Sequence, residues 1–129
     1  MLSKKVKDVM ITDVITVDSS EDVVFAFEKL MKKKVSAMPV MENDKMVGII
    51  TATDLGHNLI LDKYELGTQV NKVMVKNVVS VSSDKTLDEA IKIMKDGAQE
   101  NNILNQLPVV ENGNLIGIIS DGDILKAIS

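Results

Sequence analysis

Short runs of β-branched residues alternate along the chain with longer stretches whose apolar residues recur every three or four positions. The runs DVITVD (13–18) and NVVSVS (77–82) are typical of β-strands. Residues 23–31 and 87–94 have the apolar spacing of amphipathic helices, and each stretch follows Ser and acidic residues that can cap a helix start. The pattern therefore predicts a strand and then a helix, twice over.

Two further strands, joined by a tight turn, are expected after each of these helices. AMPVM (37–41) and MVGII (46–50) flank the turn END, and QLPVV (106–110) and LIGII (115–119) flank the turn ENG. Asn, Asp and Gly between two apolar runs predict a β-hairpin. A second helix is expected directly after each hairpin. The order β-α-β-β-α places the chain in the α/β (α+β) class.

The two halves of the chain are copies of one another. Residues 39–55 match residues 108–124 at eight of 17 positions, where unrelated sequences would share about one. The opening strand and helix match at an offset of 64 residues and this later window at 69, so the second copy carries an insertion near residues 96–105. We predict one pseudo-symmetric body made of repeat 1 (1–60), a linker (61–71) and repeat 2 (72–129).

Composition narrows the classes of function. Hydrophobic residues make up 45% of the chain and aromatic residues only 2%, so an aromatic platform for single-stranded nucleic acid is not expected. The net charge is −4 and all 15 basic residues are lysine, which argues against a phosphate-backbone footprint. No signal peptide or membrane-spanning run is visible in the sequence. We expect a soluble, cytoplasmic protein that binds neither nucleic acid nor membranes.

Catalysis is not expected from this sequence. The chain has no cysteine, a single imidazole at His57, and no nucleophile paired with a base. Asp121 and Asp123 lie in one turn without the further ligand spacing of a metal site, so no metal site is predicted.

The phrase GIITATD, which ends at Asp54, returns as GIISDGD, which ends at Asp123. The hydroxyl residue and the acid of each phrase, Thr51 with Asp54 and Ser120 with Asp123, have the spacing of a capping box, and capping alone would explain a single pair. A helix start also offers free N–H groups to a phosphate, and a nearby carboxylate can hold two ribose hydroxyls. The duplication at symmetric positions favours the binding interpretation.

With these motifs each copy resembles a CBS domain, and the pair resembles the tandem called a Bateman module. The resemblance covers about residues 6–127 and rests on the order of VM, ITV or VSV, VSAMPV or NQLPVV, and the duplicated phrase. In that family, G-x-x-[ST]-x-x-D typically holds an adenosine nucleotide, with Asp on the ribose hydroxyls, Ser or Thr near the phosphate, and the backbone before the proline on the adenine. The resemblance implies two repeats packed through their sheets, with binding in the cleft between them.

Carried over position by position, the resemblance implies two ligand-binding sites. Site 1 comprises Thr16, Val35, Ser36, Ala37, Met38, Thr51 and Asp54. Site 2 comprises Ser80, Asn105, Gln106, Leu107, Ser120 and Asp123.

The two predicted sites are not equivalent. In the second copy the insertion lies next to the base-binding segment, and Asn105 and Gln106 replace small residues. Asp121, where the first copy has Ala52, places an acid beside the expected phosphate, and like charges repel. Tighter binding is therefore expected at Asp54.

The resemblance implies a small stand-alone CBS-pair protein that senses AMP, ADP, ATP or an S-adenosylmethionine-type ligand and acts as a regulatory module. No other cofactor is required, and magnesium could accompany a nucleotide. A homodimer and a regulated partner protein are also implied. The alternative is a ligand-free structural or dimerisation module that holds a partner protein. A regulatory piece of a larger enzyme or transporter is less favoured, because the chain begins with Met and ends just after its last predicted helix.

Overall fold

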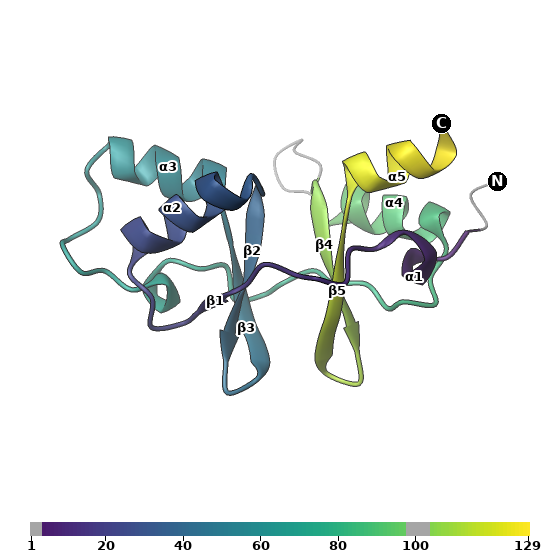
Figure 1. Ribbon diagram of the computed structural model, residues 1–129, viewed down its shortest axis with the longest axis horizontal. Helices are drawn as coiled ribbons and strands as arrows, with labels where there is room; N and C mark the ends of the chain where they lie inside the picture. The colour runs from purple at the N-terminus through teal and green to yellow at the C-terminus, as the bar shows by residue number, and fades with distance from the viewer. Residues whose placement is uncertain (1–3, 98–103) are drawn as a thin grey trace. The chain divides into compact units, whose positions relative to one another are not determined.

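The computed structural model describes residues 4–97 and 104–129, and its chain forms two units (Figure 1). Unit 2 consists of residues 15–78. Unit 1 combines the N-terminal segment, up to residue 14, with the chain from residue 79 onward. Helices and a small β-sheet are present in each unit, so the predicted α+β class is confirmed. The predicted insertion at 96–105 lies mostly outside the described residues.

Unit 2 packs two helices against a three-stranded sheet (Figure 1). Its elements are β1 (Val17–Asp18), α2 (Val23–Lys33), β2 (Ala37–Glu42), β3 (Lys45–Thr51), α3 (Ala52–Ile60) and the 3₁₀ helix η1 (Val70–Lys72). The strand order is β1-β2-β3, with β1 parallel to β2 and β2 antiparallel to β3. The buried core is Val17, Val23, Ala26, Leu30, Met38, Val40, Ile50, Leu55 and Val70.

Unit 1 repeats this arrangement with a two-stranded sheet. Its elements are α1 (Val6–Val9), α4 (Leu87–Asp96), β4 (Gln106–Glu111), β5 (Asn114–Ser120) and α5 (Asp121–Ile128). Strands β4 and β5 are antiparallel. The buried core is Val6, Val81, Leu87, Ala90, Met94, Leu107, Val109, Ile119 and Ile124. Burial of aliphatic side chains is the main force that holds each unit together.

Both predicted hairpins are present, and their turns have the backbone that the sequence requires. Asn43 and Asp44 have φ of 51° and 65°, and Asn112 and Gly113 have φ of 51° and 80°. Two-residue hairpin loops with both central residues at positive φ match the right-handed twist of the strands, and Asn, Asp and Gly adopt this conformation most readily.

The opening strand of each copy is much shorter than the sequence predicted, which corrects that expectation. Of residues 13–18 only Val17 and Asp18 form a strand, and of residues 77–82 only Val81 pairs, in a single parallel bridge to Val109. The Val81 N–H donates to the Pro108 carbonyl at 3.0 Å. Extending this ladder backwards would need an N–H from residue 108, and proline has none.

Pro39 has the same place in unit 2, where Val17 pairs with Val40. The ladder of β1 therefore cannot extend back to residue 15 through an N–H of residue 39. The β-branched residues before Val17 have strand propensity but lack a full set of hydrogen-bonding partners on β2.

Unit 1 is completed by the N-terminal segment of the chain, shown in purple in Figure 1. The Val6 N–H donates to the Lys85 carbonyl at 2.8 Å, and the Val6 side chain is fully buried. Ile11 and Ile118 exchange two backbone hydrogen bonds of 2.8 and 2.9 Å. Residues 4–11 thus contribute hydrogen bonds and core to the same unit as the second hairpin.

Unit 2 is completed in the same way by residues 70–75, at the junction of the linker and the second copy. The Val70 N–H donates to the Glu21 carbonyl at 2.8 Å, and Val70 is fully buried. Ile49 and Val75 exchange two backbone hydrogen bonds of 3.0 Å each. The two units in space are thus a different division of the chain from the two repeats in the sequence, whose boundaries stay a prediction.

Candidate functional site

The start of α3 brings together most of the polar groups predicted for site 1. The Thr51 hydroxyl accepts a hydrogen bond from the Asp54 N–H at 3.1 Å, so Thr51 is the N-cap of the helix. The Ala52 N–H donates to the Ser36 carbonyl at 2.9 Å, and Ala37 lies opposite Thr51 in the β2–β3 ladder. The segment before Pro39 and the helix start are therefore held side by side by main-chain bonds.

The start of α5 in unit 1 has the same main-chain arrangement. The Ser120 hydroxyl accepts from the Asp123 N–H at 3.1 Å. The Asp121 N–H donates to the Asn105 carbonyl at 2.9 Å, and Gln106 lies opposite Ser120 in the β4–β5 ladder. Both predicted sites thus have one backbone frame, which a common sequence pattern dictates.

The two aspartates differ in what their carboxylates do. In unit 1 the Asp123 carboxylate reaches back and accepts from the Ser120 N–H at 2.9 Å, which completes a capping box, and Asp123 is half-buried. In unit 2 the Asp54 side chain is exposed, and its carboxylate accepts no hydrogen bond from any described residue. The Asp54 carboxylate is therefore available to a ligand, whereas the Asp123 carboxylate would first have to give up its hydrogen bond with the Ser120 N–H.

Two residues predicted for the sites have side chains that serve the cores. Met38 and Leu107 are fully buried and belong to the aliphatic clusters of unit 2 and unit 1. Successive side chains of a strand point to opposite faces, so Ala37 faces away from Met38. Only the backbone of Met38 and of Leu107 is left for a ligand. Val35 packs partly buried against the core of unit 2.

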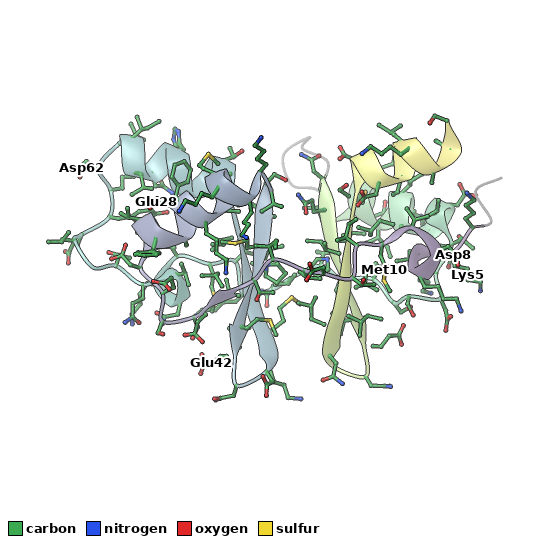
Figure 2. All side chains as sticks on the ribbon, viewed as in Figure 1. Lys5, Asp8, Met10, Glu28, Glu42 and Asp62 are labelled. Atoms are coloured by element: carbon green, nitrogen blue, oxygen red, sulfur yellow. The ribbon has the colours of Figure 1, made fainter. Side chains whose placement is uncertain are left out.

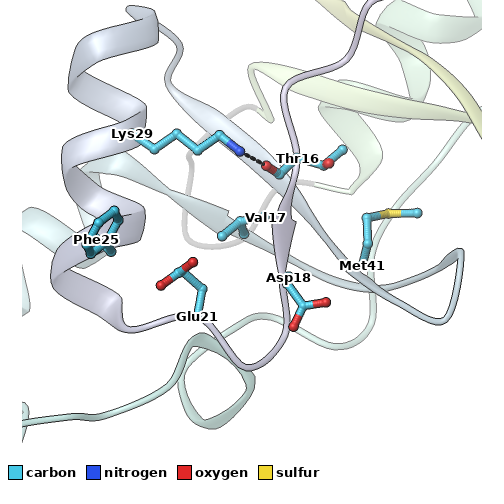
Figure 3. Close-up of a pocket in the computed structure, with 7 residues that line it drawn as sticks. All are labelled: Thr16, Val17, Asp18, Glu21, Phe25, Lys29 and Met41. Atoms are coloured by element: carbon cyan, nitrogen blue, oxygen red, sulfur yellow. Dashed lines mark hydrogen bonds between the residues drawn. The ribbon is translucent and has the colours of Figure 1, made fainter.

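Thr16 lies just before β1, at the edge of a surface pocket of about 390 Å³ (Figure 3). The pocket is lined by Thr16, Val17, Asp18, Glu21, Phe25, Lys29 and Met41. Of the residues predicted for site 1, only Thr16 lines it; the other lining residues come from β1, β2, α2 and the turn before α2.

A hydrogen bond that the sequence did not predict crosses this pocket. The Lys29 ammonium, from the middle of α2, donates to the Thr16 carbonyl at 2.5 Å (Figure 3). The alignment of the two copies contains one signal for it, because Lys29 aligns with Ile93 of α4. A lysine at this position, where the other copy has an apolar residue, is the one difference in the sequence that accompanies the contact.

The corresponding surface of unit 1 has different chemistry. Ser80, the counterpart of Thr16, is exposed. Lys85 and Glu89, which replace Glu21 and Phe25, form an ion pair at 3.6 Å. The Thr86 backbone and side chain both donate to Glu89, and these bonds lower the pKa of that carboxyl.

The glycine that opens each repeated phrase makes room for a neighbouring segment. A Cβ on Gly48 would lie 2.5 Å from the Met74 Sδ and 2.9 Å from the Val75 carbonyl oxygen. A Cβ on Gly117 would lie 2.7 Å from the Met10 Sδ and 3.0 Å from the Ile11 carbonyl oxygen. Figure 2 shows Met10 beside β5. These glycines are therefore required for packing within each unit, and their conservation between the copies needs no ligand.

A second feature common to both copies is a serine–glutamate hydrogen bond. The Ser19 hydroxyl donates to the Glu42 carboxylate at 3.0 Å, and the Ser83 hydroxyl donates to Glu111 at 2.6 Å. The Ser83 N–H also donates to Glu111, and the side-chain and backbone bonds together lower the pKa of Glu111. Each bond joins the turn after the opening strand to the hairpin end.

Other chemistry is sparse in the described part of the chain. Residues 4–97 and 104–129 contain no group of three or more His, Asp or Glu side chains placed to hold a metal ion. Across the same residues, no helix combines the length and the apolar character needed to cross a bilayer. His57 is exposed on α3.

Comparison with known proteins supplies the family context for this geometry. The family model for the CBS domain matches the chain twice, at residues 6–59 and 70–129. An inosine-5′-monophosphate dehydrogenase of Methanocaldococcus jannaschii is 40% identical over 125 residues, which is 95% of this chain and 23% of that enzyme. An uncharacterized protein of the same organism is 34% identical over 126 residues, 97% of this chain and 40% of its own length. The chain thus spans less than half of these relatives.

Solved structures share the fold along nearly the whole chain. A CBS-domain pair in complex with 5′-methylthioadenosine and S-adenosyl-L-methionine has a TM-score of 0.81 and 27% identity, covering 97% of this chain and 95% of that one. The protein CBSX2, in complex with AMP, has a TM-score of 0.79 and 28% identity, covering 96% and 95%. A CBS-domain protein of Agrobacterium tumefaciens is 33% identical with a TM-score of 0.84, covering 98% and 95%.

Proposed function

This chain belongs to the CBS-domain family, and on that premise we propose that unit 2 binds an adenosine-containing ligand at the start of α3. The observation that carries the proposal is the exposed Asp54 carboxylate, which no described residue engages, at the first turn of a helix. A carboxylate with free acceptor oxygens is suited to two neighbouring hydroxyls, such as those of a ribose, because charge-assisted hydrogen bonds are strong.

The groups around Asp54 provide the proposed contacts for the phosphate and the adenine of the ligand. The Thr51 hydroxyl lies beside the first N–H groups of α3, where the helix dipole favours a negatively charged group such as a phosphate. The segment at Ser36, an exposed residue whose carbonyl accepts from the Ala52 N–H at the helix start, is proposed to contact the adenine. The remaining site 1 residues, Thr16, Val35, Ala37 and the Met38 backbone, are proposed to surround the base.

The class of ligand is supported by two similar proteins that were solved with adenosine compounds, one with 5′-methylthioadenosine and S-adenosyl-L-methionine and the other with AMP. For unit 1 we propose a weaker site that uses Ser120, Asp123, Ser80, Asn105, Gln106 and the Leu107 backbone. Binding there has to break the Asp123–Ser120 hydrogen bond and to overcome the charge of Asp121.

The proposed role is regulatory rather than catalytic. A ligand shifts the balance between two states of a protein only if it binds them with different affinity, so the signal would be a change of packing or assembly that a partner protein reads. Formation of a homodimer, and a partner protein that responds to the change, are also part of this proposal. The alternative is a ligand-free dimerisation module. In that case Thr51 with Asp54, and Ser120 with Asp123, serve only as the starts of α3 and α5 and bind no ligand.

Binding measurements on nucleotide-free protein test the proposal directly. We expect AMP, ADP, ATP or S-adenosyl-L-methionine to raise the unfolding temperature and to give a measurable calorimetric Kd. Asp54→Asn should weaken binding about 10- to 100-fold, because hydrogen bonds to a charged group contribute roughly 1.5–3 kcal/mol. Asp123→Asn should weaken it less.

The matched control is Glu28→Gln, which removes one negative charge from an exposed position of α2 in the same unit. Its affinity should stay within about twofold of the unmodified protein, since exposed charges interact weakly across solvent. If no adenosine ligand binds protein that is shown to be free of carried-over nucleotide, the proposed function is wrong and the dimerisation module is favoured.

A further inference from the structure

We propose that Lys29 is a positioning residue for site 1: its ammonium holds the Thr16 backbone in place, and the affinity of unit 2 for its ligand depends on that bond. The proposal rests on the proposed function, because Thr16 matters only if the adenosine site is real. It adds to the site a residue that lies on α2, outside the repeated motif.

The sheet holds Thr16 on one side only. Strand β1 has only two residues, Val17 and Asp18, and it is an edge strand. Its ladder on β2 cannot extend back to residue 15 through residue 39, because Pro39 has no N–H. Thr16 directly precedes the ladder, and its carbonyl, on the open edge of β1, accepts from Lys29.

Lys29 supplies that contact from the neighbouring helix. Its side chain is half-buried and spans from α2 to the Thr16 carbonyl, along the pocket wall that Phe25 and Val17 also form (Figure 3). An ammonium donor makes a stronger hydrogen bond than a neutral one. The Thr16 carbonyl and the Val17 N–H belong to one planar peptide group, and Val17 pairs with β2, so the bond from Lys29 adds a second anchor on the opposite side of that peptide.

Fixing Thr16 before the ligand arrives lowers the entropy lost on binding. In unit 1 this arrangement is missing, because the residue aligned with Lys29 is Ile93, whose side chain cannot donate a hydrogen bond to Ser80. The two sites therefore differ in a second respect, besides the extra acid at Asp121: only site 1 has its opening segment held by a side chain of the following helix.

Calorimetric titration with AMP tests this role, using Lys29→Met and Lys29→Arg. Methionine keeps the apolar stem and removes the donor, so Thr16 has to be ordered on binding and AMP affinity should fall about tenfold. Arginine keeps a charged donor and should recover most of the affinity, to within about threefold. Lys32→Met, an exposed lysine of the same helix, is the matched control for lost charge and should leave the affinity unchanged.

Far-UV circular dichroism and the urea midpoint separate positioning from folding. We expect Lys29→Met to retain the cooperative unfolding transition while it loses affinity. If Lys29→Met does not fold, Lys29→Leu, which also lacks a donor, replaces it with the same threshold. AMP binding within about twofold of the unmodified protein in the variant that folds, or an equal loss in Lys29→Arg, overturns the role of Lys29 while leaving the proposed function intact. If the unmodified protein binds none of the adenosine ligands, the proposed function fails first, and Lys29 has no site to position.

Discussion

Helices α3 and α5 begin with the same spacing from hydroxyl to aspartate, on the same hairpin frame, yet the two aspartates behave differently. Asp123 accepts from the Ser120 N–H and caps its own helix, whereas the Asp54 carboxylate is exposed and accepts no hydrogen bond from a described residue. A capping box and a ligand site draw on the same chemical groups, so the sequence motif alone does not separate them. The difference is that the Asp123 carboxylate accepts from the N-cap N–H of its helix, whereas the Asp54 carboxylate does not.

The largest expected effect concerns the segments that complete each unit. Val6 and Val70 occupy equivalent positions and are fully buried, the first in unit 1 and the second in unit 2. Val6→Asp should cost about 4 kcal/mol of stability, because it buries a charge without a partner. Although residue 6 belongs to the first copy, the loss of amide protection on hydrogen exchange should fall on β4 and β5.

Val70→Asp is the reciprocal experiment, and its loss of protection should fall on β2 and β3. The same exchange data contain the internal control, since the hairpin of the other unit should keep the higher protection in each variant. Loss of protection in β2 and β3 alone on Val6→Asp would contradict the division into units described above.

A smaller effect is expected at the glycines. Gly48→Ala should destabilise the protein by roughly 1–3 kcal/mol, because the new Cβ overlaps the Met74 side chain and approaches the Val75 carbonyl oxygen. Gly122→Ala is the matched substitution in α5, where the nearest atom, the Ser120 Oγ, lies at 3.7 Å. It should stabilise the protein by about 0.5–1 kcal/mol, since alanine is the better helix former. Urea unfolding midpoints measure both, and a destabilised Gly122→Ala would show that the start of α5 is more crowded than described.

The smallest effect exchanges the residues that distinguish the two helix starts. Ala52→Asp should weaken AMP binding at site 1 about fivefold, since two like charges a few ångströms apart near the surface repel by roughly 1 kcal/mol or more. Asp121→Ala should strengthen AMP binding at site 2 by a similar factor. Adenosine, which has no phosphate, should bind each variant as it binds the unmodified protein. Parallel titrations with the two ligands therefore isolate the charge, and an equal change for adenosine would instead indicate a steric effect.

The parts of the fold that were predicted well are those whose causes are local. Asn43 with Asp44, and Asn112 with Gly113, adopt positive φ readily, so the turns could be located from residue type alone. The helix starts followed from the hydroxyl and acidic residues before each apolar stretch. The predicted length of the opening strands was wrong because strand propensity carries no information about the strand they pair with. Here the pairing strands, β2 and β4, each contain a proline.

The segments that complete the units depend on a non-local choice that the sequence leaves open. Residues 6–11 and 70–75 carry similar patterns, with Val6 aligned to Val70 and Met10 to Met74. Either segment has the apolar residues to pack beside either glycine of the repeated phrase, so local pattern does not decide which unit each joins.

For the candidate site, the sequence located the backbone frame and one difference between the copies, the acid Asp121 in place of Ala52. It did not reveal that the Asp123 carboxylate accepts from the Ser120 N–H while the Asp54 carboxylate is exposed. The bond from Lys29 to Thr16 joins residues 13 positions apart through a helix and a strand end, and no local pattern encodes it.

The division of the chain between the units has a consequence for the order in which they form during synthesis on the ribosome. Unit 2 is one continuous stretch, so all of its hydrogen-bonding partners exist once residue 78 has emerged. Unit 1 uses the first and the last parts of the chain, and Val6 has no core to enter until α4 and the second hairpin have been made. Residues 4–11 are therefore translated before unit 2 but can become buried only after it, and the unit containing Asp54 can fold while the other is still incomplete.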